Sequence, residues 1–108
     1  MKMFKIGTDI IRISRIEKSL EKEHFKASVF TSNEILYCKN AESFAGIFAA
    51  KEAYFKAKGT GINKRLNSIE ISHDEKGKPF IVGVENSDVS ISHDGDYAIA
   101  SVILWEKL

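Results

Sequence analysis

Residues 48–62 read FAAKEAYFKAKGTGI and contain the helix on which the rest of the chain is expected to pack. At about 100° per residue, one face of this helix carries the following side chains: Ala45, Phe48, Ala49, Glu52, Phe55 and Lys56. Lys51, Tyr54 and Lys58 are expected to point elsewhere. Glu52 then lies within an apolar stripe, where a carboxylate must be paired, hydrogen-bonded or bound to a metal. The pattern therefore predicts a partner for Glu52.

The composition is typical of one ordinary folded domain, residues 1–108. The chain is 44% hydrophobic and 29% charged, with a net charge of +1. Its longest apolar run, residues 97–105, is far shorter than the roughly 20 residues that a membrane helix needs. A nearly neutral domain also lacks the basic footprint of a nucleic-acid binder. Because Cys38 is the only cysteine and the first residues contain no signal-peptide core, we expect a cytoplasmic location and neither a membrane nor a nucleic-acid partner.

The first predicted strand is MFKIGTDI, residues 3–10, which alternates with the period of a half-buried strand. Phe4, Ile6 and Thr8 share one face of this strand. Asp9 belongs to the other face and is expected near the end of the strand.

Two capping signals predict short helices. SRIE, residues 14–17, has the spacing of a capping box and predicts a helix over residues 14–23. TSNE, residues 31–34, predicts a second short helix. One face of the first helix would present a basic stripe: Arg15, Lys18 and Lys22. This stripe either docks an acidic protein or is an ordinary solvated face, relieved by Glu17 and Glu21.

The long helix is expected over residues 41–58 and should end at GTG, residues 59–61, where glycine can adopt positive φ. Four strands in an antiparallel meander are then predicted, over residues 68–73, 78–85, 88–93 and 96–105. The order of strand, helices and strands predicts an α+β fold in which an antiparallel sheet packs against the long helix.

Two carboxylates from separate elements, Asp9 and Glu52, are candidates for holding a hard cation such as Mg²⁺, which implies a phosphorylated substrate. A buried ion pair between Glu52 and Lys56, with Asp9 capping a turn, explains the same residues. Lys56 precedes the GTG loop, where an ammonium and glycine amides can meet phosphate oxygens. Helix capping is the simpler role for those glycines. His73 and His93 each end a predicted strand, and the residues alone favour neither as a functional group.

Three blocks considered together identify a family: IGTDIIRISRI (6–16), FAAKEAYFKAKGTGI (48–62) and VSISHDGDYAIASVI (89–103). They resemble, in order and spacing, the holo-acyl-carrier-protein synthase family of phosphopantetheinyl transferases, and the match extends over essentially the whole chain. The resemblance implies the 4′-phosphopantetheinyl transferase fold. It also implies transfer of 4′-phosphopantetheine from coenzyme A to a serine of apo acyl carrier protein in fatty acid biosynthesis, with release of adenosine 3′,5′-bisphosphate.

The resemblance also assigns roles to residues. Asp9 and Glu52 match the two protein ligands of Mg²⁺ and count as catalytic with Lys56, which stabilises the diphosphate and the leaving group. Either Glu52 or a water near Asp9 accepts the serine proton. The coenzyme A contacts match the following residues: Lys56, Gly59, Thr60, Gly61 and His93. Arg15 matches a basic residue of the carrier-docking helix, on which Lys18 and Lys22 are also expected. Family members of this short type are homotrimers with active sites between subunits.

Two departures from the family pattern concern the substrate rim. Ile47 stands where the family commonly has an arginine, so a phosphate contact is missing or supplied by Lys51, Lys64 or Arg65. The segment between Cys38 and Phe44 is also shorter than usual. Two other functions remain open: a hot-dog-like acyl-coenzyme A thioesterase, and a carrier-binding module that has lost catalysis.

Overall fold

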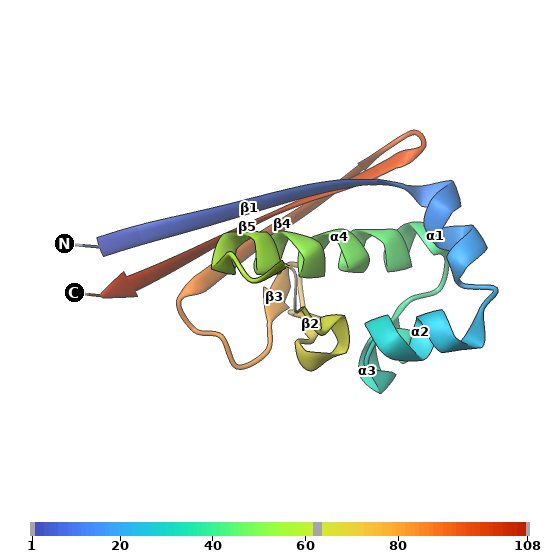
Figure 1. Ribbon diagram of the computed structural model, residues 1–108, viewed down its shortest axis with the longest axis horizontal. Helices are drawn as coiled ribbons and strands as arrows, with labels where there is room; N and C mark the ends of the chain where they lie inside the picture. Colours follow the sequence, from blue (N-terminus) through green and yellow to red (C-terminus); the bar gives the residue numbers. More distant parts are fainter. Residues whose placement is uncertain (1, 62–63, 108) are drawn as a thin grey trace.

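The longest helix, α4 (Ala41–Lys58), lies along one face of a three-stranded antiparallel sheet (Figure 1). The computed structural model describes residues 2–61 and 64–107. The sheet has the order β1 (Lys2–Arg12), β5 (Tyr97–Lys107) and β4 (Ser87–Asp94). The central strand β5 therefore pairs with β1, the first strand of the chain, and with β4, the strand that precedes it. This arrangement confirms the expected α+β fold with a long helix packed on an antiparallel sheet.

The predicted four-stranded meander is wrong. β2 (Ile71–His73) and β3 (Pro79–Ile81) form a separate two-stranded sheet, and β1 occupies the edge of the main sheet instead. After β3 the chain turns through Gly83, which has φ +77°. Lys78, directly before β3, donates from Nζ to the carbonyl of Val89 on β4 at 3.1 Å. Among the described residues, β3 lies near β4, but the two are joined here by a side-chain hydrogen bond and not by strand pairing.

The helix predicted over residues 14–23 is shorter than expected, and a further helix that follows it was not predicted. α1 (Ile13–Ser19) ends before α2 (Glu23–Val29) begins, and the N-cap of α1 is Arg12, without a side-chain capping bond. The proposed box at residues 14–17 is therefore wrong. Lys22 is the N-cap of α2 rather than part of a continuous basic stripe on α1.

Two local predictions are confirmed. Thr31 and Glu34 form a full capping box at the start of α3 (Ser32–Tyr37). Helix α4 ends at Gly59, which adopts φ +76°, as predicted for its C-terminal cap. A short 3₁₀ helix, η2 (Leu66–Ser68), precedes β2. Within the described ranges, no helix has both the length and the apolar character required to cross a bilayer.

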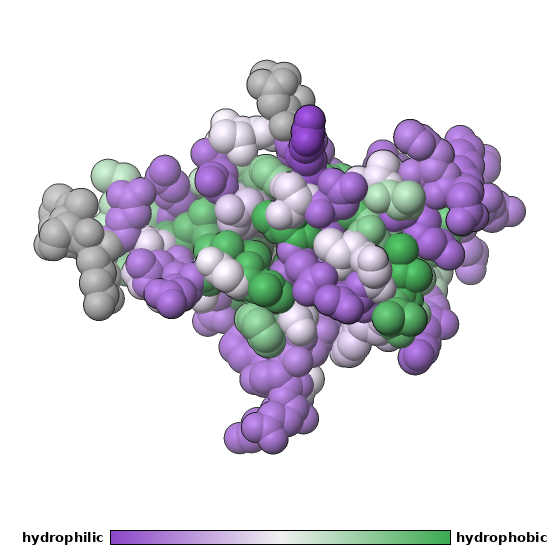
Figure 2. All heavy atoms as spheres, turned by 90° about the horizontal axis from the view of Figure 1, so that it is seen from below, coloured by the Kyte–Doolittle hydropathy of each residue, from purple (hydrophilic) through white to green (hydrophobic). Residues whose placement is uncertain are grey.

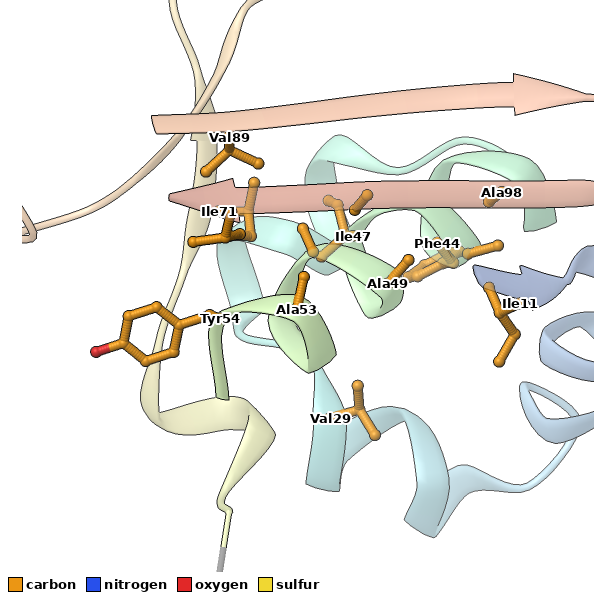
Figure 3. Packing of buried hydrophobic residues seen from close by; sticks show 14 of the residues in the cluster. Ile11, Val29, Phe44, Ile47, Ala49, Ala53, Tyr54, Ile71, Val89 and Ala98 are labelled. Atoms are coloured by element: carbon orange, nitrogen blue, oxygen red, sulfur yellow. The ribbon is translucent and has the colours of Figure 1, made fainter. Parts of the chain in front are cut away.

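Helix α4 is buried on nearly all sides rather than along one stripe. Small side chains, including Ala49 and Ala53, let other elements approach it closely, and Figure 3 shows them beside Ile47 within the core. Lys51 and Tyr54, expected to point away from the buried face, are both buried. The expectation that only one face of α4 is buried is therefore wrong, because small alanine side chains let other elements pack on several sides of the helix.

Strand β1 also turns a different face to the core than expected. A Cβ on Gly7 would lie only 1.9 Å from the carbonyl oxygen of Ala53, so the backbones of β1 and α4 meet directly. The face that includes Gly7 must therefore pack on the helix. Phe4 and Ile6, predicted to be half-buried, are instead 60% and 71% exposed.

Candidate functional site

Asp9 lies beside α4 because Gly7, two residues earlier on β1, contacts the helix backbone. Asp9 lies opposite Ala100, and β1 continues for three residues beyond it, to Arg12, which is farther than expected. Lys56 Nζ donates to Asp9 Oδ1 at 3.1 Å and to the carbonyl of Thr8 at the same distance. The Asp9 side chain is 14% exposed, whereas that of Lys56 is 54% exposed. The Lys56 side chain is therefore more than half exposed and can reach an anionic ligand while it contacts Asp9.

Glu52 lies one helical turn before Lys56, but its partner is a different lysine. Lys64 Nζ donates to Glu52 Oε2 at 2.8 Å. The hypothesis that Glu52 pairs with Lys56 is wrong, because β1 presents Asp9 to Lys56 instead. Lys64 follows the GTG loop, and nothing in the local pattern of the helix indicates it.

The two carboxylates are close enough to influence each other. Burial raises the pKa of Asp9 above its ordinary value, the charge of Lys56 opposes this shift, and the charge of Glu52 adds to it. In addition, each carboxylate contacts an ammonium group: Asp9 that of Lys56, and Glu52 that of Lys64. A pair of carboxylates that attracts cations from two directions suits a hard divalent cation.

A magnesium site built on Asp9 and Glu52 would leave most coordination positions to phosphates and water. Within residues 2–61 and 64–107, no three or more acidic, histidine or cysteine side chains are clustered for metal binding. The donor set therefore fits a cation that is shared with a phosphorylated substrate, and not one enclosed by protein ligands alone.

The GTG loop begins at the same end of α4 as Lys56. The amides of Gly59 and Thr60 both donate to the carbonyl of Phe55, at 2.9 and 3.1 Å, and so cap the helix. This agrees with the simpler interpretation of the glycines. An added Cβ at Gly59 or Gly61 would meet no atom within 4 Å, so the surface of the loop is open beside Lys56.

His93 lies far from the two carboxylates within one chain. Its Nε2 is 3.1 Å from the carbonyl oxygen of Glu42, in the first turn of α4. Gly46 makes room for the ring, since a Cβ there would lie 2.9 Å from Nε2. Glu42 precedes Glu52 by ten residues, which is about 15 Å along a helix. The structure therefore does not bring His93 to Asp9 and Glu52 in a single copy.

His93 instead shares a cavity of about 210 Å³ with His73 and Ile47. The ring of His73 stacks on Tyr37 with their centroids 4.1 Å apart, and burial lowers the pKa of His73. Ile47 is 2% exposed and forms an apolar part of the cavity wall. The position where the family commonly has an arginine thus offers no charge here.

The three residues proposed as alternative phosphate contacts differ in their exposure to solvent. Lys51 is fully buried, bonded to Glu34 and to the carbonyl of Val29, so it cannot reach a ligand at the surface. Lys64 and Arg65 are exposed and line a cavity of about 490 Å³ beside α2. The Glu34–Lys51 pair was missed from the sequence because its two residues come from different helices.

The basic residues proposed for carrier docking lie at one end of the molecule. Arg15 and Lys18 are exposed on α1, and Lys22 is exposed at the start of α2. Seen from below the view of Figure 1, hydrophilic residues gather at the end that carries α1 and α2 (Figure 2). A charged surface is therefore present there, although its lysines do not share one helix.

Comparison with known proteins gives consistent matches. The family described as the 4′-phosphopantetheinyl transferase superfamily matches residues 5–102. A holo-[acyl-carrier-protein] synthase from Nautilia profundicola is 46% identical over 110 residues, covering 92% of this chain and 97% of that protein. One from Fusobacterium nucleatum is 41% identical over 117 residues, covering 92% of this chain and 96% of that protein.

Solved structures match in fold as well. The holo-(acyl-carrier-protein) synthase of Bacillus anthracis in complex with CoA (3′,5′-ADP) has a TM-score of 0.84 at 39% identity, covering 95% of this chain and 96% of that one. The Helicobacter pylori synthase in complex with coenzyme A has a TM-score of 0.82 at 38% identity, covering 92% and 98%. These matches exclude the hot-dog thioesterase as the family of this protein. The chain belongs to the 4′-phosphopantetheinyl transferase superfamily, with the holo-[acyl-carrier-protein] synthases as its relatives.

Proposed function

We propose that this protein transfers 4′-phosphopantetheine from coenzyme A to a serine of apo acyl carrier protein, in fatty acid biosynthesis. Adenosine 3′,5′-bisphosphate is the second product, and the reaction depends on Mg²⁺. The observation that carries the proposal is the convergence of Asp9 and Glu52 beside the exposed Lys56, in a chain whose relatives include structures with coenzyme A bound.

In this proposal each residue acts on a defined part of the reaction. Asp9 and Glu52 would hold Mg²⁺, which when bound polarises the phosphate oxygens and stabilises their growing charge. The carrier serine oxygen forms a bond to the β-phosphorus while the bond from that phosphorus to the bridging diphosphate oxygen breaks. Lys56 neutralises the charge on the leaving phosphate. Glu52 or a water beside Asp9 accepts the serine proton.

The open loop and the histidine complete the proposed coenzyme A site. Gly59, Thr60 and Gly61 present a surface without obstructing side chains beside Lys56, which suits the approach of phosphate oxygens. His93 is the more distant contact. Since it lies at the opposite end of α4 from Lys56, we propose that a neighbouring copy supplies it.

An assembly of copies is supported by the outer face of the main sheet. Ile6 and Ile10 are 71% and 61% exposed on β1, and the register places Ile103 and Ile99 opposite them on β5. Exposed, contiguous apolar surface of this kind is typical of an interface. We propose a homotrimer with active sites between subunits. An Ile6→Asp variant should run as a smaller species than the wild type in sedimentation, and an unchanged mass would contradict this interface.

The carrier is proposed to dock on Arg15, Lys18 and Lys22, because exposed cations steer an acidic partner. We also propose a cytoplasmic location. Cys38 fits a reducing compartment, since it is a single buried thiol whose pKa is raised by burial to about 12.

The test is the intact mass of an apo acyl carrier protein after incubation with this protein and coenzyme A. A gain of one phosphopantetheine, about 340 Da, that requires Mg²⁺ and is lost with a chelator would support metal-assisted transfer. Carrier binding without any mass gain, for several carriers, would instead favour the non-catalytic binding module. Ile47 is the observation behind that second candidate, because it removes a charge from the cavity that contains His93.

A further inference from the structure

Glu52 and Asp9 are each held by a lysine, but the two lysines are held differently. Lys56 Nζ contacts both Asp9 and the backbone carbonyl of Thr8. Lys64 Nζ has one hydrogen bond among the described residues, to Glu52 Oε2 at 2.8 Å. Both ammonium groups can exchange a contact for water, since the Lys56 and Lys64 side chains are 54% and 32% exposed, but Lys64 has fewer protein contacts to lose. Of the two ammonium groups, Lys64 is therefore the one that is displaced more readily.

We propose that Lys64 is an internal competitor of the divalent cation at Glu52. Binding of the cation transfers Glu52 from Lys64 to the metal and releases the Lys64 ammonium toward the anionic substrate. This inference rests on the proposed function, because it takes Asp9 and Glu52 as the residues that hold the metal.

Competition follows from the position of the ammonium. An ammonium 2.8 Å from Oε2 occupies the space that a cation bonded to this oxygen would need. The two positive charges also repel each other at such a distance. When no metal is bound, the Lys64 ammonium is the cation that pairs with Glu52 at this oxygen. Loss of Lys64 should therefore favour any other cation at the same place.

The released ammonium has a defined environment. Lys64 and Arg65 line the cavity of about 490 Å³ together with Ser28 and Asn67. Two cations and two side chains with hydrogen-bonding groups suit a phosphate group. Because Lys64 already reaches Glu52, the same flexible side chain lies next to the place where a shared metal would hold the diphosphate. Lys64 can thus supply a phosphate contact that Ile47 cannot.

The first experiment measures Mn²⁺ binding by electron paramagnetic resonance, with and without coenzyme A, for the full chain. Lys64→Gln should bind Mn²⁺ about two- to fivefold more tightly than the wild type, as expected when one competing ion pair is removed. Lys58→Gln is the matched control. It removes the same charge from the end of α4, where Lys58 contacts Tyr54 instead of a carboxylate, and should change Mn²⁺ affinity by less than about twofold.

A double variant shows whether the effect acts through Glu52. In a Glu52→Gln background, Lys64→Gln should no longer tighten Mn²⁺ binding, because the two residues form one pair. With saturating Mn²⁺, Lys64→Gln should also weaken coenzyme A binding by about threefold or more, whereas Lys58→Gln should not. The first result isolates the competition, and the second isolates the role of the released ammonium.

The outcomes separate this inference from the proposed function. Wild-type Mn²⁺ binding with an unchanged or weaker affinity in Lys64→Gln overturns the competition and leaves the proposed metal site intact. Absence of Mn²⁺ binding in every variant, even with coenzyme A, overturns both. Binding that is detected only after Lys64 is replaced supports the competition directly.

Discussion

Lys51 Nζ lies 2.5 Å from Glu34 Oε1, and both side chains are completely excluded from solvent. Lys51 also donates to the carbonyl of Val29, while Glu34 Oε2 accepts from the amide of Ile71. One ion pair therefore joins α4 to α2, α3 and β2. Lys51 directly precedes Glu52. The helix that carries this proposed metal ligand is therefore attached to three other elements next to the site.

Lys51→Met should destabilise the protein by about 3–5 kcal/mol, because it leaves the Glu34 carboxylate buried without its partner. Urea unfolding followed by circular dichroism measures the change. Lys58→Met, which removes an exposed lysine from the same helix, should cost less than about 1 kcal/mol. Equal losses of unfolding free energy in the two variants would show that the buried ion pair contributes no more to stability than an exposed lysine does.

Glu52→Gln should retain the fold and reduce phosphopantetheine transfer by about 100-fold or more, as expected when a group that holds catalytic charge is neutralised. The rate is read from the intact mass of the carrier, and the fold from the thermal transition. Glu75→Gln, at an exposed position outside the site, is the control and should retain the wild-type rate. Full activity of Glu52→Gln would contradict the proposal that Glu52 holds the metal.

Asp9→Asn should make the protein more stable at neutral pH while abolishing transfer. The folded-state pKa of Asp9 lies above its ordinary value of 3.8, mainly because of burial. The folded protein thus binds this proton more tightly than the unfolded chain does. Stability from this group is present at low pH and is lost as pH rises through the folded pKa.

The measurement for Asp9 is the free energy of unfolding between pH 3 and pH 7 for wild type and variant. The advantage of Asp9→Asn should shrink as the pH falls toward the ordinary carboxyl range, roughly pH 4. An advantage that grows as the pH falls would have the wrong sign and would contradict the raised pKa.

Gly7→Ala should be severely destabilising, by about 3 kcal/mol or more, because the new methyl group would overlap the backbone of α4 at Ala53. Thermal unfolding measures the loss. Gly61→Ala provides the comparison, since a Cβ there meets nothing within 4 Å, and its stability should change by less than about 1 kcal/mol. A mild effect of Gly7→Ala would mean that β1 can move away from the helix.

Reversal of charge at Arg15 and Lys18 should slow carrier association without changing coenzyme A binding. The double variant Arg15→Glu/Lys18→Glu is expected to lower kcat/KM for the carrier by about tenfold at low salt, with a smaller effect at high salt. Lys76→Glu, in the β2–β3 turn, is the control. A loss that is independent of salt would indicate a structural effect on α1 instead.

Local signals allowed several elements to be predicted from the sequence. The Thr31–Glu34 capping box and the end of α4 at Gly59 depend on neighbouring residues, so short-range rules suffice. The split of the strands into two sheets depends on the turn at Gly83 and on contacts across the chain. Such long-range pairing is not encoded in the periodicity of one strand.

In the candidate site, too, features that depend on local sequence were predicted and features that depend on long-range contacts were not. Asp9 and Glu52 were identified as converging carboxylates, and the structure brings both beside lysines. The partners were assigned wrongly because pairing depends on how β1 crosses α4 and where the chain returns after the helix. Lys51 was misplaced for a related reason, since an alanine-rich helix has no single buried face and its lysine can lie inside.

The contact between Gly7 and Ala53 means that backbone atoms determine how closely β1 approaches α4. The separation between the strand that carries Asp9 and the helix that carries Glu52 is consequently insensitive to the size of nearby core side chains. Substitutions elsewhere in the core can alter stability while the two halves of the site keep their spacing. In an engineered or naturally diverged version of this chain, core substitutions that preserve the fold should therefore leave this spacing unchanged as long as residue 7 has no side chain.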